Sequence, residues 1–232
     1  MKISIIIPVY NEEKTIKKIL DLISSVNLGI KKEIVIVDDG SKDNSKKIIE
    51  KYIEHKKKNR IEYKFFSKKN EGKGSAIKKG IELTSGEIIT IQDADLEYDP
   101  EDFKKLIKPI ILGKEKVVYG SRFLRKHEPL YKIYFLGNKF LTFLTKVLYN
   151  AKITDMETCY KVFKADVIKN IEIKSNEFDF EPEITARVLK LGIKIKEIPI
   201  SYKPRSIAEG KKINWKDGLQ AIWTLLYWKF KN

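Results

Sequence analysis

The sequence predicts an α/β protein in which helices flank a mostly parallel β-sheet. Short apolar runs rich in β-branched residues alternate with helical patterns four times within roughly the first 95 residues. Acidic residues directly follow three of these runs. Because parallel neighbours need a crossover connection, the alternation indicates βαβ units. Ligands of such sheets bind beyond the carboxyl ends of the strands.

The first strand is expected over residues 3–9, an apolar run with Pro8 near its end. A helix follows Asn11, because apolar residues recur there at the spacing of one helix face: Ile16, Ile19, Leu20 and Ile23. Further strands are expected at 33–37, 61–66, 87–92, 116–120 and 193–198. Further helices are expected from about 43 to 57, at 76–83, after Pro100, at 131–149, at 181–191 and from about 214.

The composition favours anionic partners. Lys and Arg number 47 against 32 Asp and Glu, a net charge of +15, which suits nucleic acid, phosphorylated substrates or an acidic membrane. Cys159 is the only cysteine, so an intrachain disulfide is excluded and a reducing compartment is favoured. The two histidines form no zinc-binding pattern. No stretch of about 18 residues lacks charge, so we expect no transmembrane helix.

Acidic residues mark the expected carboxyl edge of the sheet. They follow three different strands as Glu12-Glu13, Asp38-Asp39 and Asp93-Ala94-Asp95. In extended chain Asp93, Asp95 and Glu97 point the same way and can converge. Clustered carboxylates and diphosphate oxygens together suit Mg²⁺ or Mn²⁺. The alternative is that Asp-x-Asp is a solvated turn or a helix cap.

Four motifs, in order, give a specific resemblance. They are Ile7-Pro8-Val9-Tyr10-Asn11-Glu12, Val35-Ile36-Val37-Asp38-Asp39-Gly40-Ser41, Asn70-Glu71-Gly72-Lys73-Gly74 and Asp93-Ala94-Asp95. The first 120 residues or so thereby resemble the family 2 glycosyltransferases, which have the Rossmann-like GT-A fold. The resemblance implies that a nucleotide sugar is bound by Pro8, Tyr10, Glu12, Val37, Asp39, Lys73, Asp93, Ala94 and Asp95.

The second half is similar to the polyprenol-phosphate (dolichyl-phosphate) hexosyltransferases. The similar segments are Asp95-Leu96-Glu97, Gly120-Ser121-Arg122-Phe123, 154–163 and 205–215. The resemblance implies metal ligation by Asp95 and Glu97, although the second ligand is often Gln in that branch. It implies an acceptor-phosphate site of Arg122, Lys132, Arg205 and Lys211, with Lys132 replacing a common arginine. Asp93, Asp95 and Arg122 would carry the catalysis.

Two helices are expected to be amphipathic. On 131–149, Lys132, Lys139 and Lys146 share one face, flanked by Asn138, Thr142 and Thr145, and apolar residues fill the other. On the last helix, a stripe of Trp215, Leu219, Ile222, Leu226 and Phe230 is joined by the aromatics Trp223, Tyr227 and Trp228. Such helices lie in a membrane interface or pack on the sheet or on a second subunit.

The domain expectation is a GT-A domain over 1–212, with a nucleotide-sugar half to about 122 and an acceptor half from about 123. A C-terminal amphipathic helix follows over 213–232. The expected function is inverting transfer of glucose or mannose from UDP-glucose or GDP-mannose to a polyprenyl or dolichyl phosphate. The enzyme would lie peripherally at the cytoplasmic face of the cell membrane.

Other functions stay open. A saccharide acceptor would need a general base, for which Asp155, Glu157 and Glu181 are candidates. The net charge also fits a nucleic-acid binder, but the acidic rim opposes this and no nucleic-acid-binding signature is visible, so no nucleic acid partner is expected. A nucleotidyltransferase would share the fold but lacks a Gly-rich N-terminal loop here.

Overall fold

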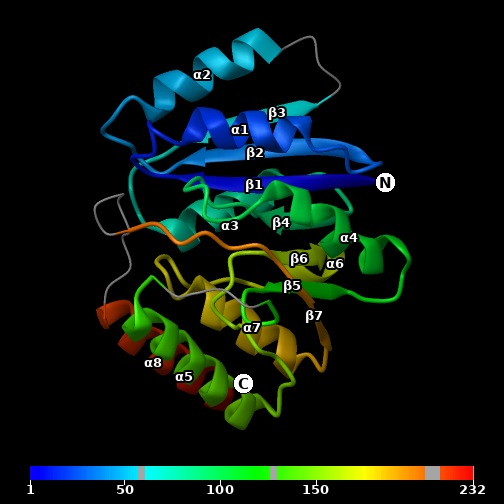
Figure 1. The fold of residues 1–232 in the computed structure, drawn as a ribbon, viewed down its shortest axis with the longest axis vertical. Coiled ribbons are helices and arrows are strands. Elements are labelled where there is room, and N and C mark those ends of the chain that lie inside the picture. The colour runs from blue at the N-terminus through cyan, green and yellow to red at the C-terminus, as the bar shows by residue number, and fades with distance from the viewer. Residues whose placement is uncertain (57–60, 126–129, 207–214, 232) are drawn as a thin grey trace.

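A seven-stranded sheet forms the centre of the protein (Figure 1). The computed structural model describes residues 1–56, 61–125, 130–206 and 215–231. The strand order across the sheet is β3-β2-β1-β4-β6-β5-β7. The strands are β1 (Lys2–Val9), β2 (Lys31–Asp38), β3 (Glu62–Ser67), β4 (Ile88–Ile91), β5 (Val117–Ser121), β6 (Lys161–Lys164) and β7 (Ile195–Pro199).

The sheet is mostly parallel, as predicted, with one exception. β1 pairs in parallel with β2 and β4, β2 with β3, and β5 with β7. β6 lies between β4 and β5 and runs antiparallel to both. β6 was not predicted from the sequence, because four residues that begin and end with lysine resemble a surface turn.

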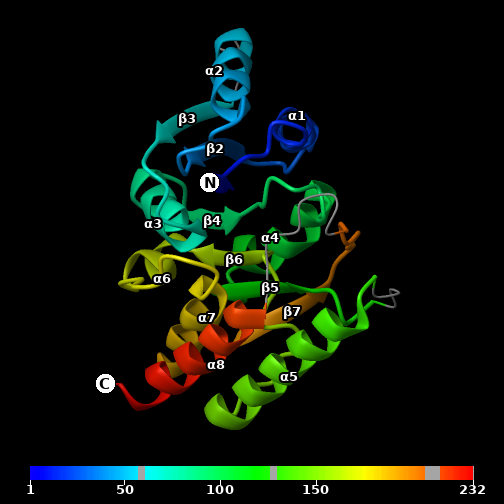
Figure 2. The same cartoon turned by 90° about the vertical axis from the view of Figure 1, so that its left-hand side faces the viewer.

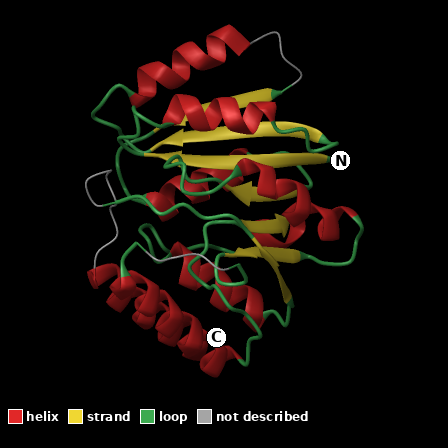
Figure 3. Cartoon of the chain, in the orientation of Figure 1, coloured by secondary structure: helices red, strands yellow, loops and turns green. Residues whose placement is uncertain are grey.

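Helices cover both faces of the sheet, which explains why the strands are apolar on both sides. Figure 2 shows α1 and α4 on one face and α3, α6 and α7 on the other, and Figure 3 shows the resulting layers. The helices are α1 (Ile16–Ser25), α2 (Ser45–Lys56), α3 (Lys73–Leu83), α4 (Phe103–Ile111), α5 (Lys132–Tyr149), α6 (Ala165–Lys169), α7 (Phe180–Lys190) and α8 (Trp215–Phe230). A short 3-10 helix, Pro100–Asp102, precedes α4.

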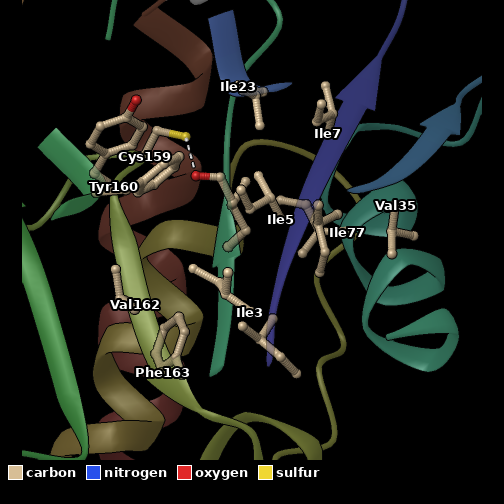
Figure 4. Close-up of a cluster of buried hydrophobic side chains, with 14 of the residues drawn as sticks. Ile3, Ile5, Ile7, Ile23, Val35, Ile77, Cys159, Tyr160, Val162 and Phe163 are labelled. Atoms are coloured by element: carbon tan, nitrogen blue, oxygen red, sulfur yellow. Dashed lines mark hydrogen bonds between the residues drawn. The ribbon is translucent and has the colours of Figure 1, made fainter. Parts of the chain in front are cut away.

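The main core lies on both sides of β1. Ile3, Ile5 and Ile7 have no exposed surface and pack beside residues of β2, β6 and α3 (Figure 4). Each fully buried aliphatic side chain contributes about 1.5–3 kcal/mol by leaving water. Cys159 closes this core near β4, with Sγ 3.8 Å from the Ile91 carbonyl oxygen. The core therefore fixes the strand ends from which the acidic residues project.

A second, smaller core joins α5, α7 and α8. Its buried members include Leu141, Met156, Ala186 and Leu225. Trp228 belongs to it with 7% exposure, so the expectation that Trp228 serves an interface is wrong. Its ring packs 4.4 Å from the Arg187 guanidinium. Among the described residues, no helix is long and apolar enough to cross a membrane.

Candidate active site

Asp39 organises the turn that precedes α3. It follows β2 directly and is 2% exposed. Its carboxylate accepts hydrogen bonds from Lys68 Nζ at 2.7 Å, from Asn70 Nδ2 at 3.1 Å and from the Gly72 backbone amide at 2.8 Å. Gly72 has φ 101, and a Cβ there would meet the Asn176 carbonyl oxygen at 2.4 Å. The predicted nucleotide contact Asp39 thus shapes the loop that carries Lys73.

Lys73 links two carboxylates at the start of α3. Its Nζ lies 2.9 Å from an Asp93 carboxylate oxygen and 2.9 Å from a Glu181 carboxylate oxygen, and Glu181 lies in the first turn of α7. Burial alone would lower the pKa of Lys73, but the charges of Asp93 and Glu181 outweigh it and hold that pKa well above its ordinary value. Lys73 is therefore a fixed positive charge next to the Asp93-Ala94-Asp95 motif.

Asp95 and Glu97 meet at a different cation, Arg205. The Arg205 guanidinium places Nη2 3.6 Å from Asp95 Oδ2 and Nε 4.0 Å from Glu97 Oε1. Nη1 also lies 3.2 Å from Glu12 Oε1. The segment after β7, orange in Figure 1, runs across the molecule toward the carboxyl ends of the parallel strands. Arg205 follows β7 in this segment and reaches carboxylates that follow β1 and β4.

The route by which Asp95 and Glu97 converge differs from the expectation. The chain turns instead of running extended, with Leu96 in the left-handed region at φ 63. Non-glycine residues adopt this conformation rarely and often at functional sites. Asp93 pairs with Lys73 while Asp95 and Glu97 face Arg205, so the three carboxylates are neighbours that bind two different cations.

The electrostatics of Asp95 indicate that this site holds excess negative charge. Burial and the nearby charges of Asp93 and Glu97 raise the pKa of Asp95 to about 7, although Arg205 acts in the opposite direction. A divalent cation beside these carboxylates would relieve the repulsion.

The donor set suits a metal that is shared with a substrate. Within the described part of the chain, no group of three or more His, Cys, Asp or Glu side chains is placed to enclose a metal ion. Asp95 and Glu97 supply two carboxylates, and Mg²⁺ in nucleotide enzymes commonly uses one or two carboxylates together with phosphate oxygens. The residues therefore fit a cation completed by a diphosphate, with Arg205 as its counter-charge in the absence of that ligand.

Arg122 forms a buried ion pair beside this cluster. Its Nε and Nη2 donate to the two Asp155 carboxylate oxygens, each at 2.7 Å, and its backbone amide donates to the same carboxylate. Burial would lower the pKa of Arg122, but Asp155 holds it well above its ordinary value. The pair uses one edge of the guanidinium and does not need the Nη1 donors.

Tyr202 connects the Arg122 pair to the Asp95–Glu97 turn. Its hydroxyl donates to Glu97 Oε2 at 3.0 Å, and its ring centroid lies 5.2 Å from the Arg122 guanidinium. The amide of Arg205 donates to Glu97 Oε1 at 2.9 Å. The two arginines predicted to bind acceptor phosphate are thus both connected to Glu97, a residue predicted to bind the metal: Arg205 directly, and Arg122 through the Tyr202 ring.

Comparison with known proteins decides the family. Residues 4–172 match the model described as Glycosyl transferase family 2. The chain belongs to the family 2 glycosyltransferases. The UDP-N-acetylglucosamine–dolichyl-phosphate N-acetylglucosaminyltransferase of Methanococcus voltae is 32% identical to it over 91% of this chain and 90% of that protein.

One further relative of this glycosyltransferase and one solved structure with a similar fold are informative. The dolichol-phosphate mannosyltransferase of Pyrococcus furiosus is 27% identical over 99% of this chain, which spans 65% of that protein. The crystal structure of glucosyl-3-phosphoglycerate synthase from Mycobacterium tuberculosis with Mn²⁺, UDP and phosphoglyceric acid shares the fold. It has a TM-score of 0.76 and 19% identity, over 100% of this chain and 79% of that one. The predicted GT-A fold and glycosyltransferase activity are confirmed.

Other predicted site residues of the glycosyltransferase occupy different places. Pro8 and Tyr10 are half-buried at the end of β1, and Ala94 is buried beside Asp95. The Val37 side chain is fully buried in the core, so a nucleotide could reach only its backbone. Lys132 is exposed at the start of α5, and no hydrogen bond or ion pair joins it to the site within the described residues. Lys211 lies outside the described residues.

Large apolar side chains gather on the outer side of α5 and α8. We call this set the apolar helix surface: Ile133, Leu136, Phe140, Phe143, Val147, Trp215, Leu219, Trp223, Tyr227 and Phe230, each 39–78% exposed. The two helices pack against each other at one end of the molecule (Figure 1, Figure 2). Thr142 and Thr145, expected on the polar side of α5, are instead buried against the protein.

The sequence did not reveal several of these relationships. Glu181 was considered only as a general base. Its pairing with Lys73 joins residues 108 positions apart, so no local pattern indicates it. Tyr202 was not singled out at all. Its only sequence signal was its position three residues before Arg205, on a loop that the family resemblance already marked.

Proposed function

We propose that this glycosyltransferase transfers a hexose from a nucleotide sugar to a polyprenyl or dolichyl phosphate at the cytoplasmic face of a membrane. The observation that carries the proposal is that Arg205 contacts Glu97 directly and that Arg122 is connected to Glu97 through Tyr202. This places cations suited to a phosphate beside carboxylates suited to a metal-bound diphosphate. Relatives named as dolichyl-phosphate sugar transferases support the choice of acceptor.

The donor is proposed to lie along the carboxyl ends of β1, β2 and β4. Pro8, Tyr10, Glu12 and Asp39 would surround the base and ribose, as the family resemblance implies. Asp95 and Glu97 would hold a divalent cation, Mg²⁺ or Mn²⁺, which when bound stabilises charge on the leaving diphosphate. Lys73 keeps Asp93 in place, and UDP- and GDP-sugars are both candidates.

The acceptor phosphate supplies its own nucleophile. With a second pKa near 6, a phosphate monoester is largely ionised at neutral pH, so no protein base has to remove a proton. A phosphate oxygen forms the bond to the anomeric carbon while the bond from that carbon to the diphosphate breaks, and the configuration inverts. Arg122 and Arg205 orient the attacking phosphate, which requires Arg205 to exchange its carboxylate partners for the incoming anion.

The apolar helix surface supports work at a membrane. Its aromatic residues and the exposed lysines Lys132, Lys139 and Lys146 of α5 are the combination found on interfacial helices. A lipid phosphate could then reach Arg122 from the bilayer without leaving it completely.

A saccharide acceptor is the second candidate, because one carboxylate near Arg122 remains available as a base. Asp155 is paired with Arg122 and Glu181 with Lys73, but Glu157 Oε1 is buried without a hydrogen-bond partner among the described residues.

The experiment that tests the proposal is label transfer from UDP-glucose, UDP-N-acetylglucosamine and GDP-mannose. Polyprenyl phosphate and soluble saccharides are offered as acceptors, with Mn²⁺, Mg²⁺ or EDTA. Metal-dependent labelling of the lipid supports the proposal. Labelling of a saccharide alone contradicts it and favours the second candidate.

A further inference from the structure

Glu157 is the exception in a loop whose other polar groups are held in place. The loop over 154–160 connects α5 to β6. Glu197 accepts hydrogen bonds from the Thr154 and Asp155 amides at 2.7 and 2.9 Å. The Met156 amide donates to Thr142 Oγ1, and the Cys159 amide donates to the Tyr98 hydroxyl.

Lys161 fixes the same loop from inside the protein. Its side chain is fully buried, and its ammonium donates to the carbonyl oxygens of Met156 and Thr158. These two carbonyls flank Glu157 in sequence, so the backbone that carries the glutamate is anchored on both sides. The conformation of the loop is therefore set before any ligand arrives.

One oxygen of the Glu157 carboxylate has no such partner among the described residues. This oxygen, Oε1, is buried and accepts no hydrogen bond from them. Burial and the charge of Glu181 raise the pKa of Glu157 to about 7, against the influence of Lys161 and Arg122. Leaving a buried acceptor unsatisfied destabilises the folded protein, so a buried oxygen without a partner in an otherwise hydrogen-bonded loop calls for a ligand.

The charged neighbours of Glu157 indicate which ligand. They include Glu181, which is joined through Lys73 to Asp93. They also include Arg122, the proposed partner of the acceptor phosphate, whose partner Asp155 lies two residues before Glu157. A carboxylate near both donor-side and acceptor-side charges is near the point where the sugar is transferred, and a sugar presents neutral hydroxyl donors to a carboxylate oxygen.

We propose that Glu157 accepts a hydrogen bond from a hydroxyl of the donor sugar and so helps to select which sugar is transferred. This rests on the proposed donor class but not on the proposed acceptor. Hydrogen bonds to a charged group are the stronger kind, and a buried acceptor discriminates against a sugar that lacks the matching hydroxyl.

The test is donor binding without any acceptor. Calorimetry compares the Kd of UDP with those of UDP-glucose and UDP-N-acetylglucosamine, and that of GDP with that of GDP-mannose. For the wild type, Glu157→Gln and Glu157→Ala, the ratio of the nucleotide Kd to the nucleotide-sugar Kd isolates the sugar contribution. Glu172→Gln, which changes an exposed glutamate, is the matched control.

We expect Glu157→Ala to reduce that ratio about tenfold, with the Kd of the bare nucleotide within about twofold of wild type. Glu157→Gln, which keeps an acceptor oxygen and the side-chain volume, should retain part of the ratio and an unchanged Tm or a higher one. A donor whose sugar lacks the matching hydroxyl should bind the wild type with this ratio reduced by the same factor. With Glu157→Ala, removal of that hydroxyl should reduce the ratio no further.

An unchanged ratio in both variants overturns the inference, as does an equal loss for nucleotide and nucleotide sugar. A loss of kcat with an unchanged ratio also overturns it and assigns Glu157 as a general base. If the wild type binds no nucleotide sugar, the proposed function fails as well. If donors bind but lipid phosphate accepts no sugar, only the proposed acceptor fails.

Discussion

Arg205 Nη2 lies 3.6 Å from Asp95 Oδ2, so a residue expected to bind the acceptor pairs with a residue expected to bind the metal. Positive charge occupies the site before a donor arrives. A donor that brings its own cation would displace the guanidinium and free it for the acceptor phosphate. Donor binding and acceptor binding are then linked through one side chain.

Arg205→Ala should therefore affect metal and acceptor in opposite directions. Removing the competing charge should tighten Mn²⁺ binding to the nucleotide-free enzyme several-fold, as measured by electron paramagnetic resonance. The same change should lower transfer to the acceptor about 10- to 100-fold. Arg125→Ala, at an exposed arginine bonded to Ser201, is the control. Weaker Mn²⁺ binding in Arg205→Ala would contradict the competition.

Asp95→Ala should abolish metal-dependent transfer. Loss of one of two carboxylate ligands leaves the metal with a single protein ligand, so we expect activity to fall at least about 100-fold. Glu97→Gln should be milder, because an amide oxygen also ligates hard cations. Titration of activity with Mn²⁺ distinguishes the two variants, and equal activity of Asp95→Ala and wild type would remove Asp95 from the site.

Arg122→Ala should reduce stability as well as activity. It leaves Asp155, which has no exposed surface, as an unpaired buried carboxylate, at a cost of about 3–5 kcal/mol. The double variant Arg122→Met, Asp155→Leu removes both charges and should recover much of that stability but no transfer. Urea unfolding beside the transfer assay separates the two effects. Full activity in the stable double variant would exclude a role in acceptor binding.

The lowered pKa of Glu33 should make the stability of the fold sensitive to acid. Burial opposes its ionisation, but hydrogen bonds from Lys64, Ser4 and Ser85 outweigh burial and lower the pKa of Glu33 to about 2. A depressed carboxyl pKa contributes stability that is complete above the ordinary value near 4.5 and is lost as pH falls toward 2. Glu33→Gln should therefore cost about 3 kcal/mol at pH 7 and less at pH 3. An equal loss of unfolding free energy in Glu33→Gln relative to wild type at pH 7 and at pH 3 would contradict this.

The apolar helix surface should govern membrane binding. Phe140→Ser with Phe143→Ser changes two rings that are 54% and 62% exposed, so the fold should be unaffected. Partition onto vesicles with anionic lipid should fall at least about tenfold, because each ring loses its apolar burial in the bilayer. Leu112→Ser, at a 55% exposed leucine at the end of α4, is the control in a sedimentation assay. An equal loss of vesicle binding in the Phe140→Ser, Phe143→Ser variant and in Leu112→Ser would contradict membrane binding through α5.

Much of the fold follows from local patterns in the sequence. The buried strands and the acidic residues that follow them could be predicted because apolar runs and turn residues are local signals. β6 could not, since Lys161 looks like a surface residue until its ammonium is seen to be fully buried on two backbone carbonyls.

The sequence indicated many individual residues of the site but not which of them form ion pairs with one another. Motifs marked Asp95 and Arg205, yet nothing local relates Glu12 to Arg205, which lie 193 positions apart. The left-handed Leu96 that turns Asp95 and Glu97 toward Arg205 is equally invisible, because leucine carries no propensity for that conformation. Glu157 was recognised only as a candidate base, because an unsatisfied oxygen is a property of the folded chain.

The most direct measurement is transfer of labelled hexose into a lipid extract, with polyprenyl phosphate compared with polyprenol that lacks the phosphate. We predict Mn²⁺- or Mg²⁺-dependent labelling of the lipid only when the phosphate is present. Asp95→Ala should label neither lipid. Label of equal amount with both lipids, or label that appears only in a soluble saccharide, would contradict it.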